Sequence, residues 1–83
     1  MILEAGQVYG ITLAGRRGLV AALFRGRYGR EQATVLIFNE RLQRWEGPVV
    51  VYRSLLVQLP ADSPVLLAAL RYKDGRPGQL SLF

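Results

Sequence analysis

The run Gly47-Pro48-Val49-Val50-Val51-Tyr52 contains the strongest strand signal in the sequence, because three valines are followed directly by a tyrosine. β-branched and aromatic side chains are enriched in strands, where they pack well on a pleated surface. A second run of this kind, Thr34-Val35-Leu36-Ile37-Phe38, precedes it and is followed by a polar, turn-like stretch at residues 39–43. Two such runs with a turn between them predict a mainly β fold.

Shorter apolar runs extend this pattern toward the N-terminus. Alternating residue types predict a strand at residues 7–13, and a continuous apolar run predicts another at residues 19–24. Stretches rich in glycine and arginine at residues 14–18 and 25–30 indicate the turns that follow these two strands. The N-terminal half of the chain is therefore expected to contain short strands joined by glycine turns.

Two further segments surround the valine run. Arg44-Trp45-Glu46 is expected to begin a strand that ends at Gly47-Pro48, and Trp45 is expected to lie in the core. The valine run continues into Leu55-Leu-Val-Gln-Leu59, either as a long bent strand or as a strand followed by a short helical turn. Counted together, these segments predict about five strands.

The pattern changes to a helical one after residue 62. Ser63 is a typical N-cap and Pro64 suits the first helical position, while helix-forming residues fill residues 65–72. Glycines and a proline at residues 75–78 then end the helix and form a linker. We therefore expect a domain at residues 1–74 and a linker with a C-terminal tail at residues 75–83.

Short strands at nearly regular spacing, joined by glycine turns, predict a small closed barrel. We expect an SH3-like or OB-like barrel of about five strands plus one short C-terminal helix. The stretches Gly6-Gln-Val-Tyr-Gly-Ile11 and Gly15-Arg-Arg-Gly-Leu-Val20 resemble the KOW-type opening of SH3-like barrels in ribosomal and transcription factors, although the usual lysines are absent. This resemblance supports the barrel and implies no ribosomal role.

Composition argues against catalysis. The 83 residues include no cysteine and no histidine, and the six carboxylates are scattered singly along the chain. A general base or a metal site needs several such groups at one point, so we expect no enzyme activity, metal or cofactor. Glu31 and Glu40, each beside an arginine, are expected to be solvated turn charges. The absence of cysteine, of a membrane-spanning apolar run and of a signal-like N-terminus leads us to expect a cytoplasmic protein.

The charge distribution suggests a polyanionic partner. The net charge is +5, and ten of the eleven basic residues are arginines. A segment without acidic residues contains the candidate nucleic-acid-binding residues: Arg16, Arg17, Arg25, Arg27, Tyr28 and Arg30. If residues 13–25 form a hairpin, both loops with their arginines can approach one edge of the barrel. Guanidinium groups would then hold phosphates, and Tyr28 would stack on a base or pack over the sugar backbone. Alternatively, Phe24 is a core residue and the arginines only keep the loop soluble.

The last five residues carry a more specific signal. They are Gln79, Leu80, Ser81, Leu82 and Phe83, and they resemble the peptide by which bacterial polymerases and repair proteins bind the DNA polymerase III β sliding clamp. That resemblance implies that Leu82 and Phe83 fill a deep hydrophobic pocket and that Leu80 occupies a shallower subsite. Gln79 would form a hydrogen bond at the mouth of the groove, beside the small Ser81. The alternative is that these residues form a last strand of the barrel.

Together these features predict a non-enzymatic accessory factor of DNA replication or repair. It would bind the β sliding clamp through its tail and DNA through the arginine-rich segment, with RNA a less favoured ligand and no membrane partner. Two alternatives stay open: a clamp inhibitor that does not bind DNA, and an RNA- or ribosome-associated SH3-like barrel with a structural tail.

Overall fold

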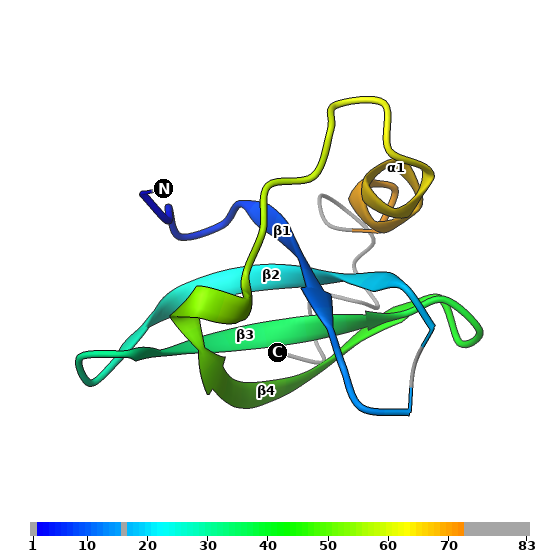
Figure 1. Cartoon of the computed structure of the whole chain (residues 1–83). Helices are drawn as coiled ribbons and strands as arrows, with labels where there is room; N and C mark the ends of the chain where they lie inside the picture. Colours follow the sequence, from blue (N-terminus) through cyan, green and yellow to red (C-terminus); the bar gives the residue numbers. More distant parts are fainter. Residues whose placement is uncertain (1, 16, 73–83) are drawn as a thin grey trace.

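The computed structural model describes residues 2–15 and 17–72 and has a mainly β architecture with one short α-helix (Figure 1). The elements are β1 (Val8–Thr12), β2 (Leu19–Tyr28), β3 (Gln32–Asn39), β4 (Arg44–Tyr52), a 3-10 turn η1 (Arg53–Leu55) and α1 (Pro64–Leu70). The strands form one antiparallel sheet in the order β1-β2-β3-β4, so each strand pairs with its neighbours in sequence. The predicted β-rich class is confirmed.

Strand β2 is longer than its sequence predicts. Residues 25–28 were expected in a turn, but the structure pairs Arg27 with Ala33 and Tyr28 with Gln32 of β3. The irregularity in pairing between Phe24 and Gly26 accommodates Arg25 as an extra residue, and such bulges are common in antiparallel pairs. The glycine and arginines of residues 25–28 indicate a turn in the sequence, but in the structure these residues continue the backbone pairing with β3. Only residues 29–31 connect the two strands.

Strand β4 is a single strand where two were expected. It runs through Gly47-Pro48, the dipeptide that was expected to end the first of them. The register with β3 shifts at this point, from Val35 opposite Val49 to Ile37 opposite Glu46. Proline donates no hydrogen bond to a sheet and is tolerated at such a bulge. The sheet of the described residues therefore has four strands.

The expected barrel of five strands is not confirmed, because the four strands form an open sheet. After β4 the chain turns through η1, so the short helical turn was the correct alternative for this segment, and then it crosses to β1. There Gly10 donates a hydrogen bond to the Val57 carbonyl at 2.8 Å, and Val57 donates one to the Gly10 carbonyl at 2.9 Å. This isolated bridge joins the last β-type segment to the free edge of β1.

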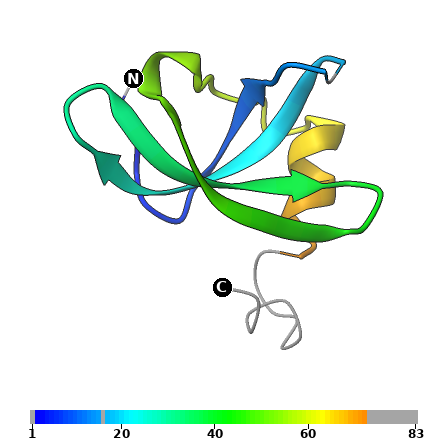
Figure 2. The same cartoon turned by 90° about the horizontal axis from the view of Figure 1, so that it is seen from below.

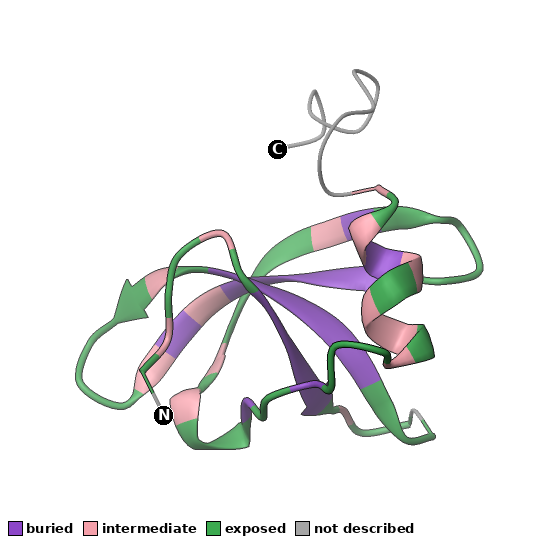
Figure 3. Ribbon diagram, turned by 90° about the horizontal axis from the view of Figure 1, so that it is seen from above, coloured by how far each residue is buried: buried purple, intermediate pink, exposed green. Residues whose placement is uncertain are grey.

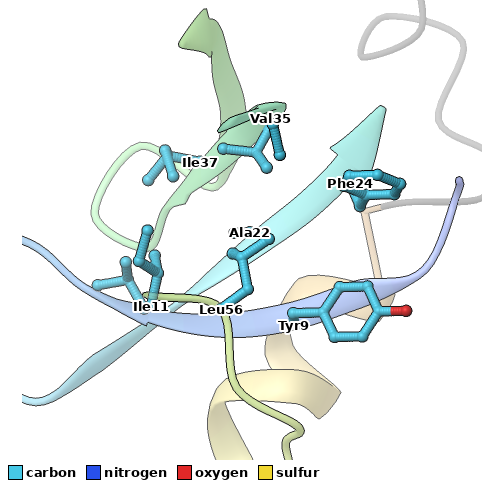
Figure 4. Close-up of a cluster of buried hydrophobic side chains, with 9 residues drawn as sticks. Tyr9, Ile11, Ala22, Phe24, Val35, Ile37 and Leu56 are labelled. Carbon is cyan, nitrogen blue, oxygen red and sulfur yellow. The ribbon is translucent and has the colours of Figure 1, made fainter. Parts of the chain in front are cut away.

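One face of the sheet carries a cluster of buried side chains, which we call the inner cluster (Figure 4). Ile11, Ala22 and Val35 are completely buried within it, and Leu56 packs there from the segment after η1. The ring of Tyr9 meets that of Phe24 edge-on at 6.4 Å, and the Tyr9 hydroxyl accepts a hydrogen bond from the Glu4 backbone. Phe24 is thus a core residue, as expected in the alternative that gave the arginines no ligand.

The opposite face carries a second buried cluster, the helix-side cluster, which α1 covers. It includes Leu36, Phe38 and Trp45 of the sheet together with Leu59 and Ala69. Trp45 is 2% exposed, which confirms the expectation that it lies in the core. Because both faces are buried in this region, β2 and β3 contain continuous apolar runs instead of alternating patterns.

Helix α1 begins as its sequence predicts. Ser63 is the N-cap, its hydroxyl accepts a hydrogen bond from the Leu66 backbone at 3.4 Å, and Pro64 is the first helical residue. The helix ends at Leu70, two residues before the expected end. It lies over the end of the sheet nearest the β3–β4 turn, while the β2–β3 turn is at the other end (Figure 1). Viewed from below, the sheet is strongly twisted (Figure 2).

Candidate nucleic-acid interface

The candidate residues at the end of the β2–β3 hairpin remain together in the folded chain. Arg25, Arg27 and Tyr28 belong to the last part of β2, and Arg30 lies in the turn that follows. All four are exposed, and this end of the sheet lies away from α1 and from the buried centre (Figure 3). Gly29 has a φ of +73°, which residues with a side chain rarely adopt, so it allows this tight turn. The hairpin thus presents a basic and aromatic tip.

Arg17 lies at the opposite end of the sheet from this hairpin tip. It belongs to the β1–β2 loop and lines a surface depression with Asn39, the last residue of β3, and Arg41 of the β3–β4 turn. Strand β2 separates the two loops, and ten residues at about 3.3 Å each span roughly 30 Å. The structure therefore does not bring both arginine loops to one edge, contrary to the expected arrangement. Arg16 lies outside the described residues.

Neighbouring residues at the hairpin tip face opposite sides of the sheet. Arg27 is paired with Ala33, which belongs to the inner cluster, so Arg27 is on the inner side. Tyr28 follows it and is paired with Gln32, so it lies on the side that α1 covers farther along. Tyr28 and Arg27 therefore cannot contact the same part of a ligand that lies flat on one face.

A second tyrosine joins Tyr28 on its face. Gln32 is the direct partner of Tyr28 on β2 and also of Tyr52 on β4, so the three side chains form a row across three strands. Tyr28 is 57% exposed and Tyr52 is 55% exposed. Neither ring contacts another aromatic ring, and neither hydroxyl forms a hydrogen bond within the described part of the chain. We call Tyr28, Gln32 and Tyr52 the tyrosine row.

The next row of paired residues on this face has short side chains and leaves free space above the sheet. Gly26, Thr34 and Val50 are paired across the same three strands. A Cβ atom added to Gly26 would meet nothing within 4 Å, so there is free space above this position. Thr34 is half-buried and Val50 is 43% exposed. A ligand that lies on the two tyrosine rings can therefore approach the sheet closely along this side.

Arg53 adds a basic group beside Tyr52. Its backbone donates a hydrogen bond to the Glu31 carbonyl at 2.8 Å, which ties the end of β4 to the β2–β3 turn. The Arg53 Nε atom is buried and has no hydrogen-bond partner in the described residues. Arg53, Tyr52 and Glu31 line an open depression of about 520 Å³ together with Leu3, Ser54 and Leu56. The depression is therefore bordered by one guanidinium group and one carboxylate, and the buried Nε atom is not exposed to a ligand in it.

The carboxylates do not gather into a metal-binding group in residues 2–15 and 17–72. In this part of the chain, no three histidine, cysteine, aspartate or glutamate side chains come together as metal ligands. Glu31 and Glu40 are exposed, as expected for turn residues. Glu46 is instead occupied by an ion pair with Arg44 at 3.3 Å and a hydrogen bond from the Asn39 amide at 3.1 Å.

The five residues expected to bind the clamp, Gln79, Leu80, Ser81, Leu82 and Phe83, lie outside the described residues. The last described helix, α1, ends at Leu70. None of the described helices has the length and apolar character needed to cross a membrane.

Sequence reasoning had missed Gln32, Tyr52 and Arg53. The tyrosine is visible in the sequence as the end of the valine run, but its place beside Tyr28 depends on the register of β3 with both neighbours. Comparisons of the chain with models of protein families, with curated proteins and with solved structures found no match. The candidate interface therefore depends on the residues and geometry given above.

Proposed function

We propose that this protein is a non-enzymatic accessory factor that binds the bacterial β sliding clamp through Gln79, Leu80, Ser81, Leu82 and Phe83. The observation that carries this proposal is the match of all five residues to the clamp-binding peptide. Short extended peptides bind by placing apolar side chains in a preformed groove, while polar groups fix their register. Leu82 and Phe83 supply the apolar anchors, and Gln79 supplies the polar group.

The folded domain supports this proposal through its basic surface. Arg25, Tyr28 and Arg30 are exposed at the tip of the β2–β3 hairpin, where guanidinium groups can hold the phosphates of DNA. Ordering a peptide tail costs roughly 1–2 kcal/mol per residue, so the tail alone should bind the clamp with moderate affinity. A domain that also holds DNA raises the effective concentration of the tail at a clamp already loaded on DNA.

The proposal also includes a more specific fold than an open four-stranded sheet. We propose that the domain is an SH3-like barrel in which the segment around Val57 serves as the last, shortest strand. Two observations support it: η1 follows β4 directly, and the Gly10–Val57 bridge brings the chain back to the free edge of β1. The meander order of the four strands favours this barrel over the OB-like alternative.

The clamp interaction is tested by surface plasmon resonance with immobilised β clamp. We expect the full chain to bind and a chain that ends at Gly78 to lose all measurable binding. The double substitution Leu82→Ala with Phe83→Ala should have the same effect, because it removes the apolar anchors and keeps the length of the tail. Ser81→Ala is the matched control, since it keeps a small residue between the two leucines and should bind as the unchanged chain does.

Failure of the full chain to bind the clamp, or equal binding by the chain that ends at Gly78, would contradict the proposal. The two alternative functions give different results. A clamp inhibitor would bind the clamp but show no affinity for DNA in low salt. An RNA-associated barrel with a structural tail would bind RNA and not the clamp.

A further inference from the structure

The tyrosine row gives the exposed end of the sheet two aromatic rings that form no ring contact and no hydrogen bond within the described domain. We propose that this row binds single-stranded DNA, with one base stacked on Tyr28 and another on Tyr52. The inference rests on the proposed function, because it takes DNA as the ligand. It adds to that function that the DNA is single-stranded. It also gives a binding role to Gln32 and Tyr52, to which the sequence alone gave no role.

The first argument is the position of the two rings. Tyr28 and Tyr52 are both direct partners of Gln32, so they lie on one face with a single strand between them. Adjacent strands are about 4.8 Å apart, which places the two tyrosine backbones roughly 10 Å from each other. Both side chains are more than half exposed, so their rings are accessible from the same side.

This spacing distinguishes single-stranded from double-stranded DNA. Successive bases of one duplex strand are separated by about 3.4 Å along the helix axis and are stacked on each other. Two bases that occupy rings roughly 10 Å apart cannot be stacked on each other as neighbours in a duplex are. A single strand can spread its bases, and base stacking on exposed aromatic side chains is a common way to bind it without strong sequence preference.

The surface between and beside the rings fits an unpaired strand. Gln32 lies between the tyrosines, and its amide offers both donors and an acceptor to the edge of a base. Gly26, in the adjacent row, leaves open space because no side chain occupies it. The strand can therefore lie close to the sheet without displacing a side chain at that position.

Two arginines of the β2–β3 hairpin lie in the same part of the chain as Tyr28 and Gln32 of the tyrosine row. Arg25 precedes Gly26 and Arg30 lies in the β2–β3 turn, and both are exposed. The exposed carboxylate of Glu31 is the opposing charge in the same turn. Two guanidinium groups and one carboxylate leave a net positive charge, which favours the phosphates of the strand that carries the stacked bases.

The test measures fluorescence anisotropy of labelled oligonucleotides with the full chain at several salt concentrations. The probes are oligothymidine, a duplex of the same length and oligouridine. We expect the tightest binding to oligothymidine. Tyr28→Ala and Tyr52→Ala should each weaken it roughly 5- to 150-fold, the effect of losing one base stack, and should change duplex binding little. Tyr28→Phe and Tyr52→Phe keep a stacking ring and should largely restore binding.

Two further measurements separate this inference from the proposed function. Arg25→Gln combined with Arg30→Gln should weaken binding to both DNA forms and reduce the salt dependence, whereas Arg17→Gln with Arg41→Gln, at the other end of the sheet, should have a small effect. Clamp binding by the tyrosine variants should equal that of the unchanged chain, and an unchanged far-ultraviolet circular dichroism spectrum shows that the variants are folded.

Equal affinity for single strand and duplex, or unchanged binding by both alanine variants, would overturn the inference and leave the proposed function intact. Tighter binding of oligouridine than of oligothymidine would overturn the assignment to DNA. If the chain binds the clamp but none of the three probes, both the inference and the DNA contact of the proposed function are wrong.

Discussion

Gly10 lies where the chain after η1 crosses β1, and this crossing leaves no room for a side chain. A Cβ atom at Gly10 would lie 2.7 Å from Leu59 Cδ2 and 3.3 Å from Val57 Cγ2. Leu59 is 4% exposed and belongs to the helix-side cluster, so it has little space into which it can move. At the scale of a single residue, this glycine permits the bridge that joins the last β-type segment to the sheet.

We therefore expect Gly10→Ala to reduce the free energy of unfolding by about 1–3 kcal/mol, the usual effect of overpacking. Gly26→Ala is the matched control, because Gly26 is also in a strand and its added methyl group meets nothing within 4 Å. Urea unfolding followed by circular dichroism measures both. Equal stability of the two variants would show that Leu59 moves aside without cost.

The single tryptophan is a useful residue-scale probe. Trp45 packs against Phe38 with ring centroids 5.1 Å apart, and Phe38 stacks on Tyr72 at 5.7 Å. This group of rings lies on the face that α1 covers. Trp45 fluorescence therefore reports on the packing of the helix against the sheet.

At the scale of elements, α1 is a seven-residue helix that depends on its cap and on burial. Isolated helices of this length are unstable in water, so tertiary contacts must hold it. Ala69 is completely buried, and Val65, Leu66 and Leu70 pack against the helix-side cluster. The Ser63 hydroxyl satisfies one of the free backbone N–H groups at the start of the helix.

Ser63→Ala is expected to lower the free energy of unfolding by about 0.5–2 kcal/mol, and toward the lower value because the capping bond is long at 3.4 Å. Ser63→Asp should retain the stability, since aspartate is an equally good N-cap. Chemical unfolding followed by Trp45 fluorescence checks both variants. A loss with Ser63→Asp as large as that with Ser63→Ala would exclude capping as the cause.

Some features of the strands and the helix could be predicted from local sequence patterns, and others could not. The N-cap, the first turn of α1 and the apolar centres of all strands were predictable, because they depend on local residue preferences. The ends of β2 and the continuity of β4 were not. Gly26 and Gly47-Pro48 indicate turns locally, whereas pairing with β3 keeps both segments in the sheet and absorbs the irregularities as bulges.

At the scale of the whole molecule, one sheet has buried side chains on both of its faces. Ile11 is completely buried in the inner cluster, and Leu36 is 1% exposed in the helix-side cluster. The two clusters share the same strands, so neither can be lost while the sheet remains intact. This arrangement predicts a single cooperative unfolding transition for the domain.

Ile11→Ala and Leu36→Ala should each reduce the free energy of unfolding by about 2–5 kcal/mol. Both variants are expected to unfold in one transition, with Trp45 fluorescence and far-ultraviolet circular dichroism giving the same midpoint. Leu67→Ala, on the exposed side of α1 at 51% exposure, is the control and should change stability little. Different midpoints from the two probes in Ile11→Ala would show that the faces unfold separately.

The sequence by itself determined the β-rich class, the capped start of the helix, the core position of Trp45 and the basic character of the chain. These follow from side-chain chemistry and from preferences that act over a few residues. Only the tertiary structure decided which residues share a surface. The length of β2 places Arg17 and Arg30 at opposite ends of the sheet, and the register of β3 places Tyr52 beside Tyr28. Strand length and register depend on pairing between distant segments, which local sequence patterns do not specify.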